Sequence, residues 1–334
     1  MADDDSFTHK TPGESDVFLF AVQSFANSLF CFLRDNDLVI LLWVAMNAAC
    51  FAVGVVYAFQ DAMPNLLKDL FKYGKTDLSS KARRQTVAYR LLHVPKRWFT
   101  HFYLVGLLWC IFLCWDTCVF CHHGSDASWV VKYLYFLSAP GDPWMDDITS
   151  LAVTLGMFFI QVLRRLLECL FMSNMTGNIH VLHYVAGILF YILVGLSLVL
   201  PYFISPQGLV PPYSLQHPKW FHLPSLVLFT WSSFHQFKCH HIFYKLRDDS
   251  QLTSIHKVPY GDWFTFVSSP HYLAEILIYM SFIMVHGGRN PYTWLMLGFV
   301  VQNLCLGATA NHHWYKAKFK SYPKSRYRIF PFLY

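Results

Sequence analysis

The chain is poor in charge and lacks the short motifs of soluble nucleotide-binding folds. Charged residues make up 14% of its 334 residues, against about 25% in soluble domains. It contains no G-x-G-x-x-G and no G-x-x-x-x-G-K-[ST], so neither a βαβ dinucleotide fold nor a P-loop is indicated. Residues 1–16 are acidic, unlike the basic start of a signal peptide. The nine cysteines are scattered and show no disulfide framework.

What is present is apolar and aromatic. Hydrophobic residues make up 55% of the chain and aromatic residues 18%, and the mean hydropathy is +0.33. This composition predicts an all-α integral membrane protein, with aromatic side chains at the membrane interfaces. Seven apolar segments are candidate membrane-spanning helices: 38–59, 100–120, 148–163 (continuing as helix to about 172), 179–204, 221–243, 270–286 and 291–310.

One further apolar segment, 17–33, is short and interrupted by polar residues, which favours an interfacial helix over a span. The chain therefore divides into an N-terminal extension, 1–37, and one seven-helix unit, 38–334. We find no internal repeat, low-complexity run or second domain.

Loop charges predict the topology. Basic residues gather in 60–99, at Arg164–Arg165, in 238–257 and in the C-terminal tail, whereas the loops between these regions are nearly free of them. Seven alternating crossings place every basic cluster on one side, which is then cytosolic by the positive-inside rule. The C-terminus is predicted to be cytosolic and the N-terminus lumenal.

The tail, 311–334, allows two interpretations. It carries six Lys or Arg and no acid, with aromatic residues throughout. Such a strip past a membrane helix marks the cytosolic side and touches anionic lipid, but it also suits a cytosolic polyanion such as a dinucleotide phosphate. Polar residues at membrane depth favour the second interpretation. The helix near 221–243 turns polar from Trp231 onward, Glu275 lies in the next span, and ionisable groups inside a membrane segment indicate a functional site by default.

Two metal-binding patterns compete with this interpretation. Cys118-x-x-Cys121-His122 has the form of a haem attachment site, as a single match at a lumenal helix end. His235, His240–His241 and His312–His313 loosely resemble the histidine boxes of di-iron membrane oxidases. The remaining histidines are dispersed, so the boxes are incomplete. We predict no metal site.

Long motifs in the C-terminal half resemble the steroid 5α-reductase family. The first is His312-x-Trp314-Tyr315-x3-Phe319-x2-Tyr322-Pro323-x2-Arg326-x4-Pro331-Phe332, and the second is Pro259-x-Gly261-x2-Phe264-x2-Val267-Ser268-x6-Glu275. Other stretches resemble the polyprenol/polyprenal reductase branch (type 3) of that family: Tyr73-Gly74-Lys75-Thr76, Val94-Pro95-Lys96-Arg97, Arg164-Arg165-x2-Glu168-Cys169 and Trp231-Ser232-Ser233-x-His235-Gln236-x-Lys238-Cys239-His240. The resemblance runs from about residue 60 to the end.

The resemblance implies a seven-helix reductase of the endoplasmic reticulum membrane. NADPH would bind among the C-terminal helices from the cytosol, and a long polyisoprenoid substrate would enter from the bilayer. The implied cofactor-binding positions are His235, Gln236, Lys238, His240, Arg247, Lys257, Gly261, Asp262, His271, Glu275, Tyr315 and Arg326. The predicted topology places all of them on the cytosolic side.

One departure bears on the substrate. Steroid-reducing members of the family carry a Gln-Glu pair in the second helix and a Tyr in the third, where this chain has Thr100-His101-Phe102 and Gln161-Val162. His101, with Tyr103 as a second candidate, is the expected donor to the substrate carbonyl, and His312 is a third candidate catalytic residue. Since hydride adds only to an electron-poor alkene, we expect reduction of polyprenal to dolichal, in support of protein N-glycosylation. The alternatives are a 3-oxo-Δ4-steroid 5α-reductase, a di-iron oxidase and a non-catalytic lipid-binding protein.

Overall fold

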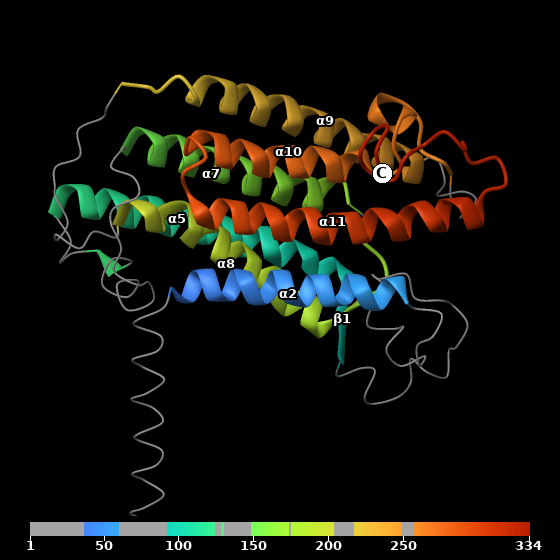
Figure 1. The fold of residues 1–334 in the computed structure, drawn as a ribbon, viewed down its shortest axis with the longest axis horizontal. Helices are drawn as coiled ribbons and strands as arrows, with labels where there is room; N and C mark the ends of the chain where they lie inside the picture. The colour runs from blue at the N-terminus through green and yellow to red at the C-terminus, as the bar shows by residue number, and fades with distance from the viewer. Residues whose placement is uncertain are drawn as a thin grey trace, which may run out of the picture.

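The computed structural model describes residues 37–59, 92–123, 128–129, 148–173, 175–203, 217–248 and 257–334. Its helices run side by side along the long axis of the molecule (Figure 1). The long helices in these ranges are α2 (Leu38–Ala58), α5 (Phe99–His123), α7 (Ile148–Phe171), α8 (Val181–Phe203), α9 (His222–Asp248), α10 (Pro270–Val285) and α11 (Pro291–Lys318). They lie at the seven predicted segments. The predicted segment 17–33 lies outside the described residues.

Five of these helices are long and apolar enough to cross a membrane: α2, α5 together with its preceding turn, α7, α8 and α11. Helix α10 is apolar but shorter. Helix α9 falls short in hydropathy because its second half is polar. The chain is a helical multi-pass membrane protein, and the number of seven spans stays a prediction. Helix α11 runs on to Lys318, eight residues past the expected end at 310, so it carries part of the basic tail.

Local sequence accounts for several helix ends. The Asp37 carboxylate accepts a 3.0 Å hydrogen bond from the Ile40 amide at the start of α2, and Asn290 caps α11 in the same way through Tyr292. Proline occupies the first turn of both α10 and α11, where its missing N–H costs nothing. Gly287 and Gly288 have positive φ and allow the tight turn between these two helices.

Helices α5 and α8 approach closely through alternating glycine–aromatic contacts. A Cβ atom at Gly187 would lie 2.6 Å from the ring of Phe102, and one at Gly195 would lie 2.4 Å from Trp109. In the opposite direction, Gly106 of α5 faces Tyr191 of α8 at 2.9 Å. Two short strands, β1 (His93–Pro95) and β2 (Asn178–His180), pair antiparallel ahead of α5 and α8. They were not predicted, because three residues are too few to show a period.

The tail folds back onto the loop before α10. Val267 and Tyr327 form a parallel bridge, in which the Ser268 amide donates to the Tyr327 carbonyl at 2.8 Å and the Tyr327 amide donates to Phe266 at 2.9 Å. The loop includes a short 3-10 helix, η5 (Asp262–Thr265). Residues 257–269 and 319–334 thus form one layer over the ends of α9, α10 and α11 (Figure 1).

Candidate active site

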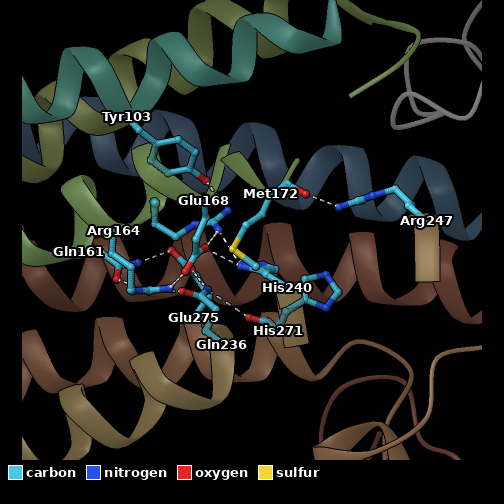
Figure 2. A network of polar contacts seen from close by, with 11 residues as sticks. Tyr103, Gln161, Arg164, Glu168, Met172, Gln236, His240, Arg247, His271 and Glu275 are labelled. Atoms are coloured by element: carbon cyan, nitrogen blue, oxygen red, sulfur yellow. Dashed lines mark hydrogen bonds and ion pairs between the residues drawn. The ribbon is translucent and has the colours of Figure 1, made fainter. Parts of the chain in front are cut away.

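Charged and polar side chains from four helices converge inside the bundle (Figure 2). Helix α5 contributes one, α7 four, and α9 and α10 two each. We call this set the charge cluster: Tyr103, Gln161, Arg164, Arg165, Glu168, Gln236, His240, His271 and Glu275. Eight of these nine side chains lie on α7, α9 and α10. On each of these helices the members are one or two turns apart, so they share the side that faces the neighbouring helices.

Glu168 is the centre of the cluster. Its side chain is 3% exposed, and its two oxygens accept from Arg164 at 2.5 Å and from Arg165. His240 of α9 lies 2.7 Å from the same carboxylate. The two arginines precede Glu168 by four and three residues, so one turn of α7 brings all three charges together. Desolvation of two guanidinium groups is offset only where such an acceptor is in place.

Glu275 supplies the second carboxylate. The Gln236 amide donates to it, and the Gln161 amide lies 3.4 Å away. The carbonyl oxygens of both glutamines face Arg164, with the Gln161 oxygen at 2.7 Å. The two arginines and two glutamates leave the cluster with no formal net charge, which suits its depth in the bundle.

Tyr103 links α5 to this cluster. Its hydroxyl accepts a 2.8 Å hydrogen bond from Arg165, whose guanidinium carbon also lies 4.9 Å from the centre of the tyrosine ring. The tyrosine is buried, and among the described residues its own O–H has no acceptor. A phenol held in this way has its O–H available to donate a hydrogen bond to a substrate oxygen.

His101 lies elsewhere. Its Nδ1 atom is 3.0 Å from the hydroxyl of Tyr184, and its ring is 5.4 Å from that of Trp98. It therefore belongs to an aromatic group at the start of α5 and α8. The structure brings Tyr103, and not His101, together with the predicted cofactor residues of α9 and α10.

A second group surrounds Asp262, in the loop before α10. His235 of α9 contacts its carboxylate at 2.9 Å, and Lys238 lies 3.9 Å from it. The His235 ring stacks on Trp263 at 4.3 Å. Gly261 and Asp262 both have positive φ, a conformation that glycine adopts freely and that aspartate tolerates better than most residues. This backbone turns the carboxylate toward α9.

A third group joins the tail to the same loop. The Ser268 hydroxyl lies 2.6 Å from His312 Nδ1 and 2.6 Å from the Tyr322 hydroxyl, and all three side chains are buried. The Tyr322 ring stacks on Tyr315 with centroids 5.2 Å apart. Ser268 and Tyr322 were not among the predicted site residues, although both lie in the quoted motifs.

Arg326 has the features of an anion-binding residue. Its side chain is 4% exposed and lies over the rings of Tyr260 and Tyr322, at 4.7 and 5.3 Å. Within the part of the chain that the structure describes, its Nε and Nη1 atoms have no hydrogen-bond partner. Among the described residues no carboxylate lies within ion-pair distance of it. A buried cation with free donors is stabilised by a bound anion such as a phosphate.

The remaining predicted residues lie at the edge of these groups. Arg247 is exposed and donates to the Met172 carbonyl at 2.7 Å, so it connects the ends of α9 and α7 (Figure 2). Lys257 is exposed at the start of the loop. His271 stands between α9 and α10, with its ring 5.9 Å from that of His240 and its carbonyl 3.4 Å from Gln236.

The two metal-binding patterns find no support in the described ranges. No group of three or more His, Cys, Asp or Glu there is placed to hold a metal ion. Cys118 and Cys121 are free thiols.

The fold and the site together define a class: a multi-pass helical membrane protein with a buried, charge-balanced site at one end of the bundle. Comparison with known proteins makes this specific. A sequence model of the 3-oxo-5-alpha-steroid 4-dehydrogenase family matches residues 177–334. The chain is 36% identical over 306 residues to a polyprenal reductase of Homo sapiens, covering 88% of this chain and 95% of that protein.

Two further relatives match a similar share of the chain. A polyprenal reductase of Mus musculus is 34% identical over 329 residues, covering 88% of this chain and 95% of its own. One of Danio rerio is 32% identical over 308 residues, covering 89% and 98%. The chain belongs to the steroid 5α-reductase family, in the branch of the polyprenal reductases. It is an oxidoreductase, and reduction in this family implies a nicotinamide cofactor.

Proposed function

We propose that this protein reduces the α,β double bond in the terminal isoprene unit of polyprenal, giving dolichal, with NADPH as the reductant. The observation that carries the proposal is the hydroxyl of Tyr103, held by Arg165 beside the predicted cofactor residues. The names of the relatives supply the substrate class.

The chemistry follows from the unsaturated aldehyde. When bound, NADPH would supply a hydride, which an isolated alkene does not accept. In polyprenal the electron pair displaced from the double bond moves onto the aldehyde oxygen as an enolate. Tyr103 would donate a hydrogen bond to this oxygen, and Arg165 would stabilise the charge that develops there. Protonation at the α-carbon then completes the saturated aldehyde.

The residues present fit a phosphate-bearing cofactor. Among the described residues, two buried donor atoms of Arg326 have no partner. Lys238 lies 3.9 Å from Asp262, and Lys257 is exposed in the same loop as Asp262. The aromatic rings of Trp263, Tyr315 and Tyr322 offer flat surfaces near these cations. We assign the residues around Asp262 and Arg326, together with the α9 and α10 members of the charge cluster, to the cofactor.

The steroid alternative is weaker on this site. Gln161 replaces the tyrosine of the steroid-reducing members, and both ends of its amide are engaged, with Arg164 and Glu275. The donor to a substrate oxygen is Tyr103 of a different helix.

We place the protein in the endoplasmic reticulum membrane with a cytosolic C-terminus, because its basic clusters all fall on the tail side, and we expect its product to serve protein N-glycosylation.

A reduction assay tests the proposal. Purified protein in nanodiscs is given NADPH and one of three lipids: polyprenal, polyprenol or a 3-oxo-Δ4-steroid. Mass spectrometry follows the gain of two hydrogens. We expect turnover of polyprenal alone; turnover of the alcohol in the absence of aldehyde, or preference for the steroid, would overturn it. Measurements of iron content and oxygen dependence separate the reductase from an oxidase.

A further inference from the structure

The last turn of the chain presents two apolar side chains outward. Phe332 is 79% exposed and Leu333 is 86% exposed. The turn is closed by the amides of Ile329 and Phe330, which both donate to the main-chain oxygen of Tyr334, at 2.9 and 3.0 Å. Phe332 has a φ of 65°, a left-handed conformation that bulky residues seldom adopt. In this conformation both side chains lie outside the protein core.

Contacts with α11 fix the position of this turn along the helix axis. The Tyr334 hydroxyl is 2.8 Å from Thr309 Oγ1, which itself donates to the Cys305 carbonyl of α11. Thr309 is near the end of the apolar part of α11, because Asn311, His312 and His313 follow it. It lies nine residues before the end of that helix, or about 13 Å along its axis. The chain has therefore returned from the cytosolic end to the level where the apolar run stops.

The surroundings of the turn are basic. Arg328 lies over the Tyr334 ring at 4.5 Å, and Lys320 and Lys324 are exposed on the preceding segment. Within the described chain, none of these three has a carboxylate at ion-pair distance. An apolar tip flanked by unpaired cations, at the height where hydrocarbon gives way to headgroups, is complementary to an anionic leaflet.

We propose that Phe332 and Leu333 insert into the cytosolic leaflet as a membrane anchor, with Arg328, Lys320 and Lys324 on its anionic headgroups. The anchor fixes the segment that carries Arg326, since Phe332 is only six positions further along the chain. It thereby holds the tail closed over the loop at 257–269. The insertion itself requires only the predicted topology and stands apart from the reaction.

Photocrosslinking tests the anchor directly. The photoreactive analogue p-benzoyl-phenylalanine replaces Phe332 in the full-length protein, reconstituted in nanodiscs of phosphatidylcholine and phosphatidylserine. After irradiation, intact-protein mass spectrometry detects covalent phospholipid. Phe51, an exposed residue of the membrane helix α2, serves as the positive control, and fully buried Phe264 as the negative control. We expect phospholipid adducts at 332 with a yield close to that at 51 and well above that at 264.

The crosslinking pattern can also contradict the anchor. If position 51 forms phospholipid adducts and position 332 forms none, or crosslinks only to protein, the anchor is wrong. A second measurement uses the variant with both Phe332→Ser and Leu333→Ser. We expect its affinity for NADPH in the same nanodiscs to fall several-fold. If the lipid adducts form but purified wild-type protein does not reduce polyprenal, the anchor stands and the proposed function fails.

Discussion

The Arg165 guanidinium donates a hydrogen bond of 2.8 Å to the Tyr103 hydroxyl. This contact joins a residue at the start of α5 to the charge balance around Glu168. It also gives the two candidate donors on α5 different roles, because His101 is directed to Tyr184 instead. Two positions apart on a helix, the two side chains point in directions about 200° apart, so only one of them can face the cluster.

Replacing Tyr103 with Phe removes the hydroxyl and keeps the ring. We expect kcat for polyprenal to fall about 10²- to 10³-fold, as for the loss of one oxyanion donor, while the Kd for NADPH stays unchanged. Steady-state kinetics and cofactor titration measure the two effects. His101→Ala is the matched control and should keep most of the activity; a larger loss in that variant than in Tyr103→Phe would reverse the assignment.

Arg326 is expected to bind a phosphate of the cofactor. Arg326→Ala should raise the Kd for NADPH about 10- to 100-fold, corresponding to a charge-assisted hydrogen bond of about 1.5–3 kcal/mol. Lys318→Ala makes the same change of charge at an exposed site at the end of α11, outside the proposed anchor, and should leave the Kd near that of the wild type. Equal effects of both substitutions would indicate a general effect of tail charge. Isothermal calorimetry or fluorescence titration provides the values.

Ser268 is expected to hold the ring of His312, a candidate catalytic residue, in position. Ser268→Ala removes a hydroxyl with hydrogen bonds to His312 and Tyr322, and kcat should fall about 2- to 12-fold, the effect of about 0.5–1.5 kcal/mol. The double variant with His312→Ala should be no less active than His312→Ala alone, since both changes act on one unit. Ser281→Ala is the control, because that hydroxyl bonds only within its own helix. Additive losses in the double variant would mean that the serine acts independently.

Glu168 should matter for stability as well as for the site. Glu168→Gln leaves the cations of Arg164 and Arg165 without their carboxylate, which costs about 3–5 kcal/mol for a buried pair. Glu275→Gln, measured without cofactor, should cost less, because two amides and no cation of the described chain contact Glu275. Thermal unfolding in detergent compares the two. A similar fall in Tm for both variants would argue against the central place of Glu168.

The close approach of α5 and α8 can be tested with glycine substitutions. A methyl group at Gly195 would lie 2.4 Å from the Trp109 ring, so Gly195→Ala should destabilise the protein by about 1–3 kcal/mol through overpacking. At Gly156 of α7 a Cβ has no atom within 4 Å, and Gly156→Ala should be neutral or stabilising by up to about 1 kcal/mol. Unfolding measurements on both variants give the difference. A stable Gly195→Ala variant would show that these helices can separate.

Much of the fold follows from the sequence alone. Apolar runs located the long helices, and loop charge together with family motifs predicted a site at one end of the bundle. The pairings inside the site did not follow. Arg164 and Arg165 served as topology markers in the sequence, because a doublet of arginines at a helix end is typical of the cytosolic side. Their burial depends on Glu168 one turn later and on Gln236 and His240, which a separate helix brings to them.

The fold of the tail likewise could not be predicted from the sequence. Its motif indicated Tyr315 and Arg326, yet the fold of residues 319–334 depends on backbone pairing with 266–269, which no side-chain pattern encodes. Likewise, the choice between His101 and Tyr103 needed the direction of α5 relative to α7. Neighbouring positions on a helix differ by about 100°, and sequence alone does not say which of them faces the partner helix.

The glycine–aromatic alternation between α5 and α8 restricts the path of the substrate. Rings of Phe102, Tyr191 and Trp109 rest directly on the opposing backbone at Gly187, Gly106 and Gly195, leaving no width there for an isoprene unit. A polyisoprenoid with its aldehyde at Tyr103 must therefore leave the bundle along another side of α5. The interface between α5 and α8 is therefore closed to the substrate, and the opening toward the bilayer lies elsewhere around the bundle.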